Sequence, residues 1–248
     1  ADTMHAIMVA MVLRKNRPSS FITLLLMTTD TPIIPFLPVL DALDLTSNEV
    51  LMEEKALRLP IMTNNWPAQY GYMPLTCVDL AYTDTGLYLR FYSRGRGLKA
   101  TISEDGGRVH LDSCVEAFLR MPDEDRYYNF EFNCIGACDA SHRLSREESE
   151  PLTPEDYLEI RRAASERRDT VFEQRQGIQS FWVSAKISWR ILGLIRSSQI
   201  PDHIEGNFYK CGDETVIPHF ASWQPIHNAE PDFHRPESFA RLDLAPRS

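Results

Sequence analysis

Two neighbouring segments, residues 112–120 and 127–134, constrain the fold most, because both alternate with a period of two. In the second segment the alternation separates two sets of side chains, Tyr128, Phe130, Phe132 and Cys134 on one side and Tyr127, Asn129, Glu131 and Asn133 on the other. This pattern predicts antiparallel strands buried on one face, since successive side chains leave a strand on opposite faces. The polar side carries carboxyl and amide groups, which predicts a surface able to grip a polyhydroxylated ligand.

The remaining strand signals indicate an all-β fold. Residues 77–82 and 87–92 alternate on either side of Thr83-Asp84-Thr85-Gly86, which has the composition of a hairpin turn. Residues 181–187, 206–211 and 239–244 add further strands, whereas Arg94-Gly95-Arg96-Gly97 is expected to end one. Several short strands joined by turns predict a two-sheet antiparallel β-sandwich, here a single domain over residues 31–248.

Two helical signals interrupt the strand pattern. Ser47 to Leu57 is predicted as a helix with Ser47 as its N-cap. Thr153-Pro154-Glu155-Asp156 combines an N-cap, a proline in the first turn and acidic residues, which is typical of a helix start. Because residues 143–175 are also rich in mixed Arg and Glu, we predict a helical insertion on the β scaffold near 142–176.

Residues 1–30 differ from the rest of the chain, and we expect them to form a disordered or artefactual N-terminal tail. Their two apolar runs, on either side of Arg14, Lys15 and Arg17, are shorter than the roughly 20 residues that a membrane span needs. Translation from near Met27 would remove the tail and give a cytoplasmic protein. Export would require that Phe21 to Met27, which faintly resembles a secretory segment, act as a signal.

Charge and cysteine content exclude some classes of function. The net charge of -9 and the pI of about 5.3 disfavour nucleic acid as a partner, since phosphate contacts need clustered Lys and Arg. The five cysteines are an odd set in or beside apolar strand patterns, which predicts free, buried thiols. The four-residue spacing of Cys134, Cys138 and His142 does not match a structural zinc signature.

Four pieces of sequence then occur in a characteristic order. They are Asp112-Ser113-Cys114-Val115-Glu116-Ala117-Phe118, Phe130-Glu131-Phe132-Asn133, Gly206-Asn207-Phe208-Tyr209-Lys210-Cys211, and Ser222-Trp223-Gln224-Pro225 with Phe233-His234-Arg235-Pro236-Glu237-Ser238-Phe239. Over residues 31–246 they resemble family 9 carbohydrate-binding modules, in the divergent branch of stand-alone bacterial proteins. The resemblance implies a β-sandwich and non-catalytic binding of a mono- or oligosaccharide or a glycan chain end, in polysaccharide utilisation. It also implies calcium as a structural ion.

The resemblance assigns site residues as well. Members that bind sugar hold a ring between two tryptophans, whose positions correspond to His110 and Phe233 here, and their edge glutamate corresponds to Glu116. Glu131 and Lys210 stand where those members have an arginine and a glutamine. Rings suit the apolar face of a sugar and polar groups suit its hydroxyl edge. The candidate carbohydrate-binding set is therefore His110, Glu116, Glu131, Lys210, Phe233 and Arg235.

Other interpretations stay open at this point. Glu116 could pair with Arg235 and stabilise the sandwich instead of touching a ligand. Glu116 and Glu131 could form the carboxyl pair of a glycoside hydrolase, which makes enzyme activity an open question. A third class is a binding module for a protein partner or a haem-like ligand, for which the axial candidates are His110, His219 and Met121. The sequence carries no signal for the oligomeric state.

Overall fold

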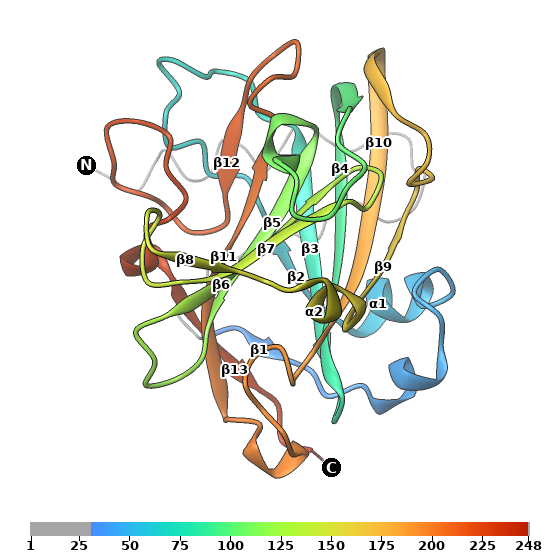
Figure 1. Cartoon of the computed structure of the whole chain (residues 1–248), viewed down its shortest axis with the longest axis vertical. Helices are drawn as coiled ribbons and strands as arrows, with labels where there is room; N and C mark the ends of the chain where they lie inside the picture. The colour runs from blue at the N-terminus through green and yellow to red at the C-terminus, as the bar shows by residue number, and fades with distance from the viewer. Residues whose placement is uncertain (1–30, 248) are drawn as a thin grey trace, which may run out of the picture. The chain divides into compact units, whose positions relative to one another are not determined.

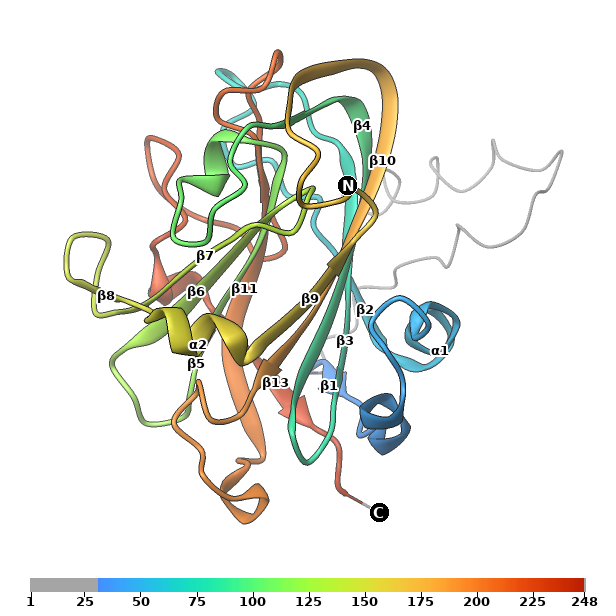
Figure 2. The ribbon, with the colours of Figure 1, turned by 45° about the vertical axis from the view of Figure 1, so that its right-hand side comes forward.

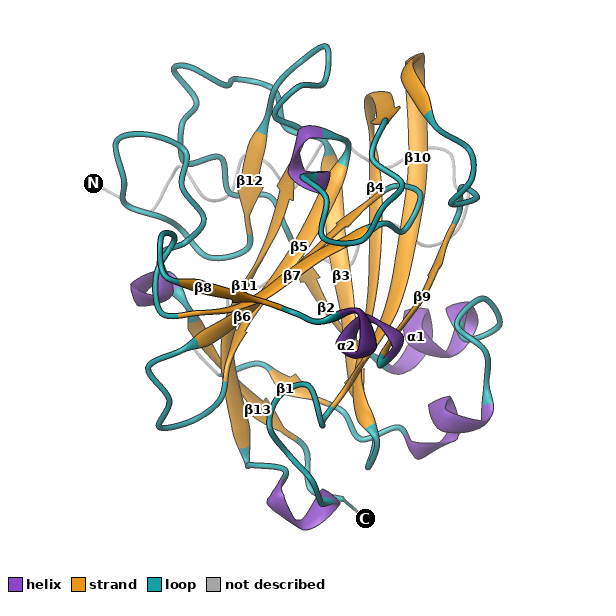
Figure 3. Ribbon diagram, in the orientation of Figure 1, coloured by secondary structure: helices purple, strands orange, loops and turns teal. Residues whose placement is uncertain are grey.

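The computed structural model describes residues 31–247, and the tail predicted for residues 1–30 lies outside the described residues. Two β-sheets face each other, with strands making up most of the regular structure (Figures 1 and 3). Sheet A runs in the order β1 (Ile33–Ile34), β13 (Ala240–Leu244), β11 (His203–Cys211), β5 (Cys114–Arg120), β6 (Tyr127–Asn133), β7 (Cys138–Arg143) and β8 (Ser149–Pro151). A short strand, β12 (Phe220–Ser222), also pairs with β11.

Sheet B has the order β2 (Leu57–Pro60), β3 (Leu75–Tyr82), β4 (Gly86–Ala100), β10 (Phe172–Ser188) and β9 (Ile160–Ala164). Its neighbouring strands are antiparallel, and so are those of sheet A except for the β1–β13 pair. The turned view of Figure 2 shows the two sheets as separate layers, with α1 (Glu49–Lys55) outside sheet B. The predicted β-sandwich is therefore confirmed.

The hydrophobic core lies between the two sheets, and it contains the apolar side of the alternating segments 112–120 and 127–134. Alternate residues of β5 and β6 point inward and pack against sheet B residues such as Val78, Phe91 and Val183. The inward-pointing residues of the two strands are Val115, Ala117, Leu119, Tyr128, Phe130 and Phe132. All are buried. Because large apolar side chains contribute about 1.5–3 kcal/mol each when fully buried, this layer is the main source of stability.

The outer face of sheet A departs from the prediction. Alternation predicts strands with one solvated face, yet every residue of β6 is buried. The cover consists of loops from distant parts of the sequence, which bring Trp66, Ile226 and Phe233 over the outward-facing Phe118 and Tyr127 in a second apolar cluster. The prediction of half-buried strands is wrong because these loops, and not solvent, lie over the polar side of β6.

The segment near 142–176 consists of short strands and loops, so the predicted helical insertion is wrong apart from α2 (Pro154–Leu158). The capping box at Thr153 forms as predicted, but the helix ends after five residues and the chain enters β9. β9 pairs with β10 over five positions, and this long-range pairing outweighs the local helical signal.

Two smaller predictions also need correction. Arg94-Gly95-Arg96-Gly97 does not end its strand, since β4 continues to Ala100. The first helix spans Glu49–Lys55, and its N-cap is Asn48 rather than Ser47. In the part of the chain described here, no helix is both long and apolar enough to cross a bilayer. The remaining regular segments are short 3-10 helices at Pro38–Ala42, Val109–Leu111 (η2), Ser197–Gln199 and Pro236–Ser238.

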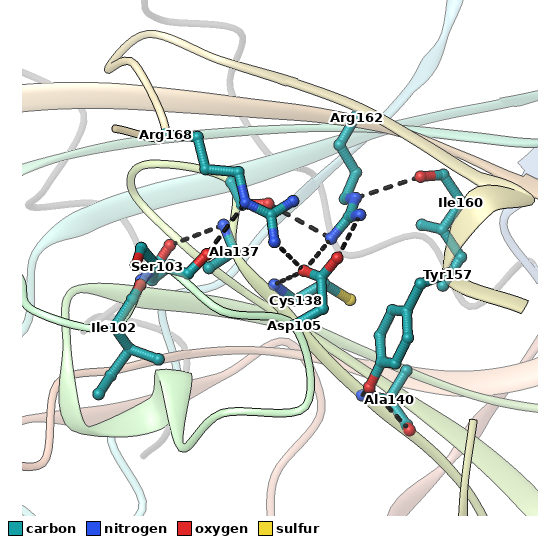
Figure 4. Close-up of polar contacts among 12 residues, drawn as sticks. Ile102, Ser103, Asp105, Ala137, Cys138, Ala140, Tyr157, Ile160, Arg162 and Arg168 are labelled. Carbon is teal, nitrogen blue, oxygen red and sulfur yellow. Dashed lines mark hydrogen bonds and ion pairs between the residues drawn. The ribbon is translucent and has the colours of Figure 1, made fainter. Parts of the chain in front are cut away.

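An ion-pair cluster fixes the loop that follows β4 against both sheets (Figure 4). Asp105 accepts hydrogen bonds from the Arg162 guanidinium of β9 at 2.6 and 2.9 Å and from the Cys138 backbone N–H of β7 at 3.0 Å. Arg168 pairs with the same carboxylate at 2.6 Å and donates to the Ser103 carbonyl. The loop thereby ties the edge of sheet B to β7, and η2 and β5 follow it in the chain.

Candidate functional site

A cavity of about 230 Å³ lies over the outer face of sheet A, on the side away from sheet B. Its floor is formed by side chains of β5, β6 and β7, namely Glu116, Glu131, Asp139 and Arg143. The rest of the lining comes from Cys211 of β11, Phe220 of β12, His110 of η2 and the loop residues Arg146, Asp213, Pro231, Asp232, Phe233 and His234. The cavity therefore combines several carboxyl groups with two arginines, two histidines and two phenylalanine rings.

Three of the carboxyl groups form a row across the floor. Glu116 is the cross-strand partner of Glu131, and Glu131 is the cross-strand partner of Asp139. We call Glu116, Glu131 and Asp139 the acidic row, and the cavity above them the acidic-row pocket. Glu116 is only 2% exposed and Glu131 only 5% exposed. Like charges placed directly opposite on neighbouring strands repel each other, so this arrangement opposes folding unless something compensates it.

Glu131 lies at the centre of the row. Its Oε1 accepts a hydrogen bond of 2.9 Å from Asn129 Nδ2, and Asn129 Oδ1 in turn accepts one of 2.7 Å from Arg143 Nε. The other oxygen, Oε2, accepts no hydrogen bond, and His110 Nδ1 lies 3.5 Å from it, an ion-pair distance. Burial alone would raise the pKa of Glu131, but the contacts with His110 and Asn129 leave it below the usual value. Glu131 is therefore the ionised member of the row.

Glu116 has the opposite tendency. Burial first, and then the charge of Glu131, raise the pKa of Glu116 well above its usual value. Its Oε1 accepts a hydrogen bond of 3.0 Å from Cys211 Sγ. Burial and the Glu131 charge also raise the pKa of Asp139, to about 6. Ionisation of the two outer members of the row is therefore opposed by burial and by the charge of Glu131.

The roof of the pocket is the loop 231–234. Phe233 is 8% exposed and stacks on Tyr209 with ring centroids 4.3 Å apart. The Tyr127 hydroxyl and His234 Nδ1 share a hydrogen bond of 2.8 Å, and burial lowers the pKa of His234 to about 4, so this ring is neutral at neutral pH. Asp232 accepts from Arg146 Nε at 3.0 Å. These contacts attach the roof to the floor in a defined position.

The structure brings four of the six predicted site residues to this pocket: His110, Glu116, Glu131 and Phe233. Lys210 is on the opposite face of β11, because it alternates with Tyr209 and Cys211, and its Nζ donates to His219 Nε2 at 2.9 Å. Arg235 does not line the pocket either. Its Nε pairs with Asp232 at 2.9 Å, so the alternative pairing of Arg235 with Glu116 is not formed.

Sequence reasoning missed several of the lining residues, above all Asp139 and Arg143. A signal was present, because Cys138 and Ala140 alternate with Asp139 and Ser141 in the manner of a strand. Asp213 and Arg146 lie on loops, where no periodicity marks a side chain as part of a site.

The three residues considered as axial ligands of a haem-like group do not lie together in the structure. His110 lines the acidic-row pocket, His219 is buried beside Lys210, and Met121 belongs to the core between the sheets.

One set of metal-ligating side chains gathers within the described residues, namely Cys114, Glu116 and Cys211, whose ligand atoms all lie within 4.8 Å of one another. Two sulfurs and one carboxylate suit zinc, whereas calcium prefers six to eight oxygens. The set therefore does not fit the calcium implied by the resemblance. All five cysteines are free, as predicted.

Comparisons with known proteins agree with this fold. A family model described as carbohydrate-binding family 9 matches residues 46–244. The crystal structure of a candidate carbohydrate-binding protein from Bacteroides uniformis is similar, with a TM-score of 0.79 and 29% identity over 87% of this chain and 100% of that chain. A family 9 module from Caldicellulosiruptor kristjanssonii, in complex with cellotriose, has a TM-score of 0.44 and 12% identity over 71% of this chain and 78% of that chain. No curated protein matches the chain.

Proposed function

The chain belongs to carbohydrate-binding family 9, and from this premise we propose that it binds a saccharide, without cleaving it, in the acidic-row pocket. The observation that carries the proposal is the pocket itself, whose lining combines the hydrogen-bonding groups of the floor with the ring of Phe233. Hydroxyl edges of a sugar can donate to the carboxylate oxygens and accept from the arginines. Its apolar face can lie against the phenylalanine.

The size of the pocket limits the ligand. About 230 Å³ is below the range of roughly 300–1,000 Å³ that is typical of sites for drug-sized ligands. We therefore expect one sugar residue, either free or at the end of a glycan chain, to enter the pocket. A chain running through the site would need a longer groove.

The placement of the carboxyl groups favours binding over hydrolysis. A glycosidase needs two carboxyls on opposite sides of the scissile bond, about 5–10 Å apart. Glu116 and Glu131 are direct cross-strand neighbours on one floor, so both approach a ligand from the same side. The difference between their pKa values needs no catalytic role, because burial and the Glu131 charge raise that of Glu116 while the contacts with His110 and Asn129 lower that of Glu131.

Isothermal titration calorimetry against a panel of monosaccharides and short oligosaccharides tests the proposal. We expect at least one sugar to bind at millimolar concentration or tighter, and Glu131→Gln to weaken it, because the amide replaces the ionised acceptor at the centre of the floor. Glu173→Gln is the matched control, since Glu173 is exposed on β10 of the other sheet. The proposal is wrong if no sugar binds, or if both variants bind as the wild type does.

A further inference from the structure

The acidic row lacks a strong cationic partner within the described part of the chain. No lysine or arginine there forms an ion pair with Glu116, Glu131 or Asp139, and the one ion-pair contact is that of His110 with Glu131. The two arginines of the pocket form no ion pair with the row, although the charge of Arg143 lowers the pKa of Asp139. Arg143 donates to Asn129 and to the Arg146 carbonyl, and Arg146 pairs with Asp232. The pocket therefore has an excess of acidic groups that the protein does not neutralise.

One oxygen of the row is also left without a donor. Glu131, on the pocket floor, is only 5% exposed, and its Oε2 accepts no hydrogen bond, since its ion-pair partner His110 Nδ1 lies 3.5 Å away. Leaving a buried charged acceptor unsatisfied costs more than the 1–3 kcal/mol typical of a neutral group, and such atoms are rare in native proteins. This is a second and independent sign that a donor enters from a ligand.

The geometry of the row distinguishes the kind of cation. A divalent metal needs three or more ligand atoms gathered closely around one point. Within residues 31–247, the one group of side chains whose ligand atoms lie this close together consists of Cys114, Glu116 and Cys211. Glu131 and Asp139 do not belong to it. An ammonium group instead carries three N–H donors on a single compact centre. It can satisfy one oxygen directly while its charge offsets that of the neighbouring acids.

We propose that the acidic-row pocket selects an amino sugar with a free, protonated amine over the corresponding neutral and N-acetylated sugars. The ammonium group donates to Glu131 Oε2, and the sugar ring lies beside Phe233 in the pocket. This inference rests on the proposed function, because it specifies the class of saccharide that the same pocket takes. The acetylated sugar loses both the charge and two of the three donors.

The protonation of the pocket supports this assignment. The charge of Glu131 and burial raise the pKa values of Glu116 and Asp139, so a positive charge beside the row would favour the ionised forms of both carboxyl groups. The other titratable and charged groups that face the row are His110 of η2, Arg143 of β7, Arg146 of the β7–β8 loop, Asp213 after β11, and Asp232 and His234 of the roof.

The experiment compares three hexosamines, glucosamine, galactosamine and mannosamine, with their N-acetylated and hydroxyl counterparts by calorimetry near neutral pH. We expect at least one hexosamine to bind about tenfold more tightly than both counterparts, the effect of one charge-assisted hydrogen bond. Glu131→Gln should abolish the preference, Asp139→Asn should reduce it, and Glu173→Gln should leave it unchanged.

The outcomes separate the two proposals. If neutral or acetylated sugars bind as tightly as the hexosamines, the inference is overturned and the proposed function stands. If no sugar binds, both are overturned. A hexosamine preference that persists in a folded Glu131→Gln protein would also overturn the inference, because the attraction would then come from the overall negative charge. Asp139→Asn gives the same test should Glu131→Gln fail to fold.

Discussion

Replacing Asp139 by asparagine is expected to stabilise the protein, although Asp139 lines the proposed site. Burial and the charge of Glu131 raise the pKa of Asp139 from 3.8 to about 6. A folded-state pKa above the unfolded value means that the folded protein keeps a proton that the unfolded chain releases. Stability is therefore lost as pH rises from about 4 to about 6, and the loss remains at higher pH. Asparagine cannot ionise and escapes this loss.

The size of the expected gain in unfolding free energy follows from the shift in the pKa of Asp139. One pKa unit corresponds to about 1.4 kcal/mol, so a rise from 3.8 to about 6 corresponds to about 3 kcal/mol. The side chain is partly exposed, which weakens the repulsion through solvent screening and lowers the expectation to about 2 kcal/mol. Asp139→Asn should thus exceed the wild type in unfolding free energy by about 2 kcal/mol near neutral pH. The two proteins should be nearly equal at about pH 3.

Urea unfolding at several pH values measures this difference, because the other titrating groups are common to both proteins and largely cancel. Asp125→Asn is the control: Asp125 is exposed between β5 and β6, and its replacement should change stability by less than about 0.5 kcal/mol. A stability difference that does not vary with pH would refute the reasoning. So would a variant that is less stable than the wild type near neutral pH.

Two further predictions concern the scaffold. Gly206→Ala should destabilise the protein by about 1–3 kcal/mol in urea unfolding, because the added Cβ would lie 2.5 Å from the Phe118 carbonyl oxygen. Gly71→Ala is the control and should be tolerated, since its added Cβ would lie 3.5 Å from the nearest atom. Equal losses of stability in the two variants would contradict the packing argument. With a thiol reagent at mildly alkaline pH, the native protein should react slowly at Cys77, whose pKa burial raises to about 11, and not at its four buried cysteines. All five should react rapidly once it is unfolded, and fast labelling of two or more native thiols would be inconsistent with the described burial.

The fold was predictable where the signal is local. The alternation in 127–134 correctly assigns Phe130 and Phe132 to the core, because the side that packs between the sheets is strictly apolar. The helix start at Thr153 was also correct, since a capping box involves only neighbouring residues. The length of that helix was not predicted correctly, because the pairing of β9 with β10, from Val183 with Ala164 to Ile187 with Ile160, joins residues distant in sequence and decides where the helix ends.

The site was predictable only in part, and for the same reason. Glu116 and Glu131 could be placed on neighbouring strands from their own segments, and the structure makes them direct partners. Asp139 was missed because its strand lies at the start of a segment whose composition favoured a helix. Lys210 lies on the other face of β11, and a correspondence between family positions does not state which face a residue occupies. The burial of the whole floor depends on distant loops and has no local signal.

The way the pocket is built has a consequence for how such a protein can change during evolution. The floor belongs to central strands that are packed on both faces, so a new side chain there must satisfy the fold before it can serve a ligand. The roof is a single surface loop, 231–234, and the neighbouring Arg146 lies on a hairpin tip. Diversification among relatives should therefore accumulate first in the roof, and the same four positions offer the simplest starting point for a library with altered sugar preference.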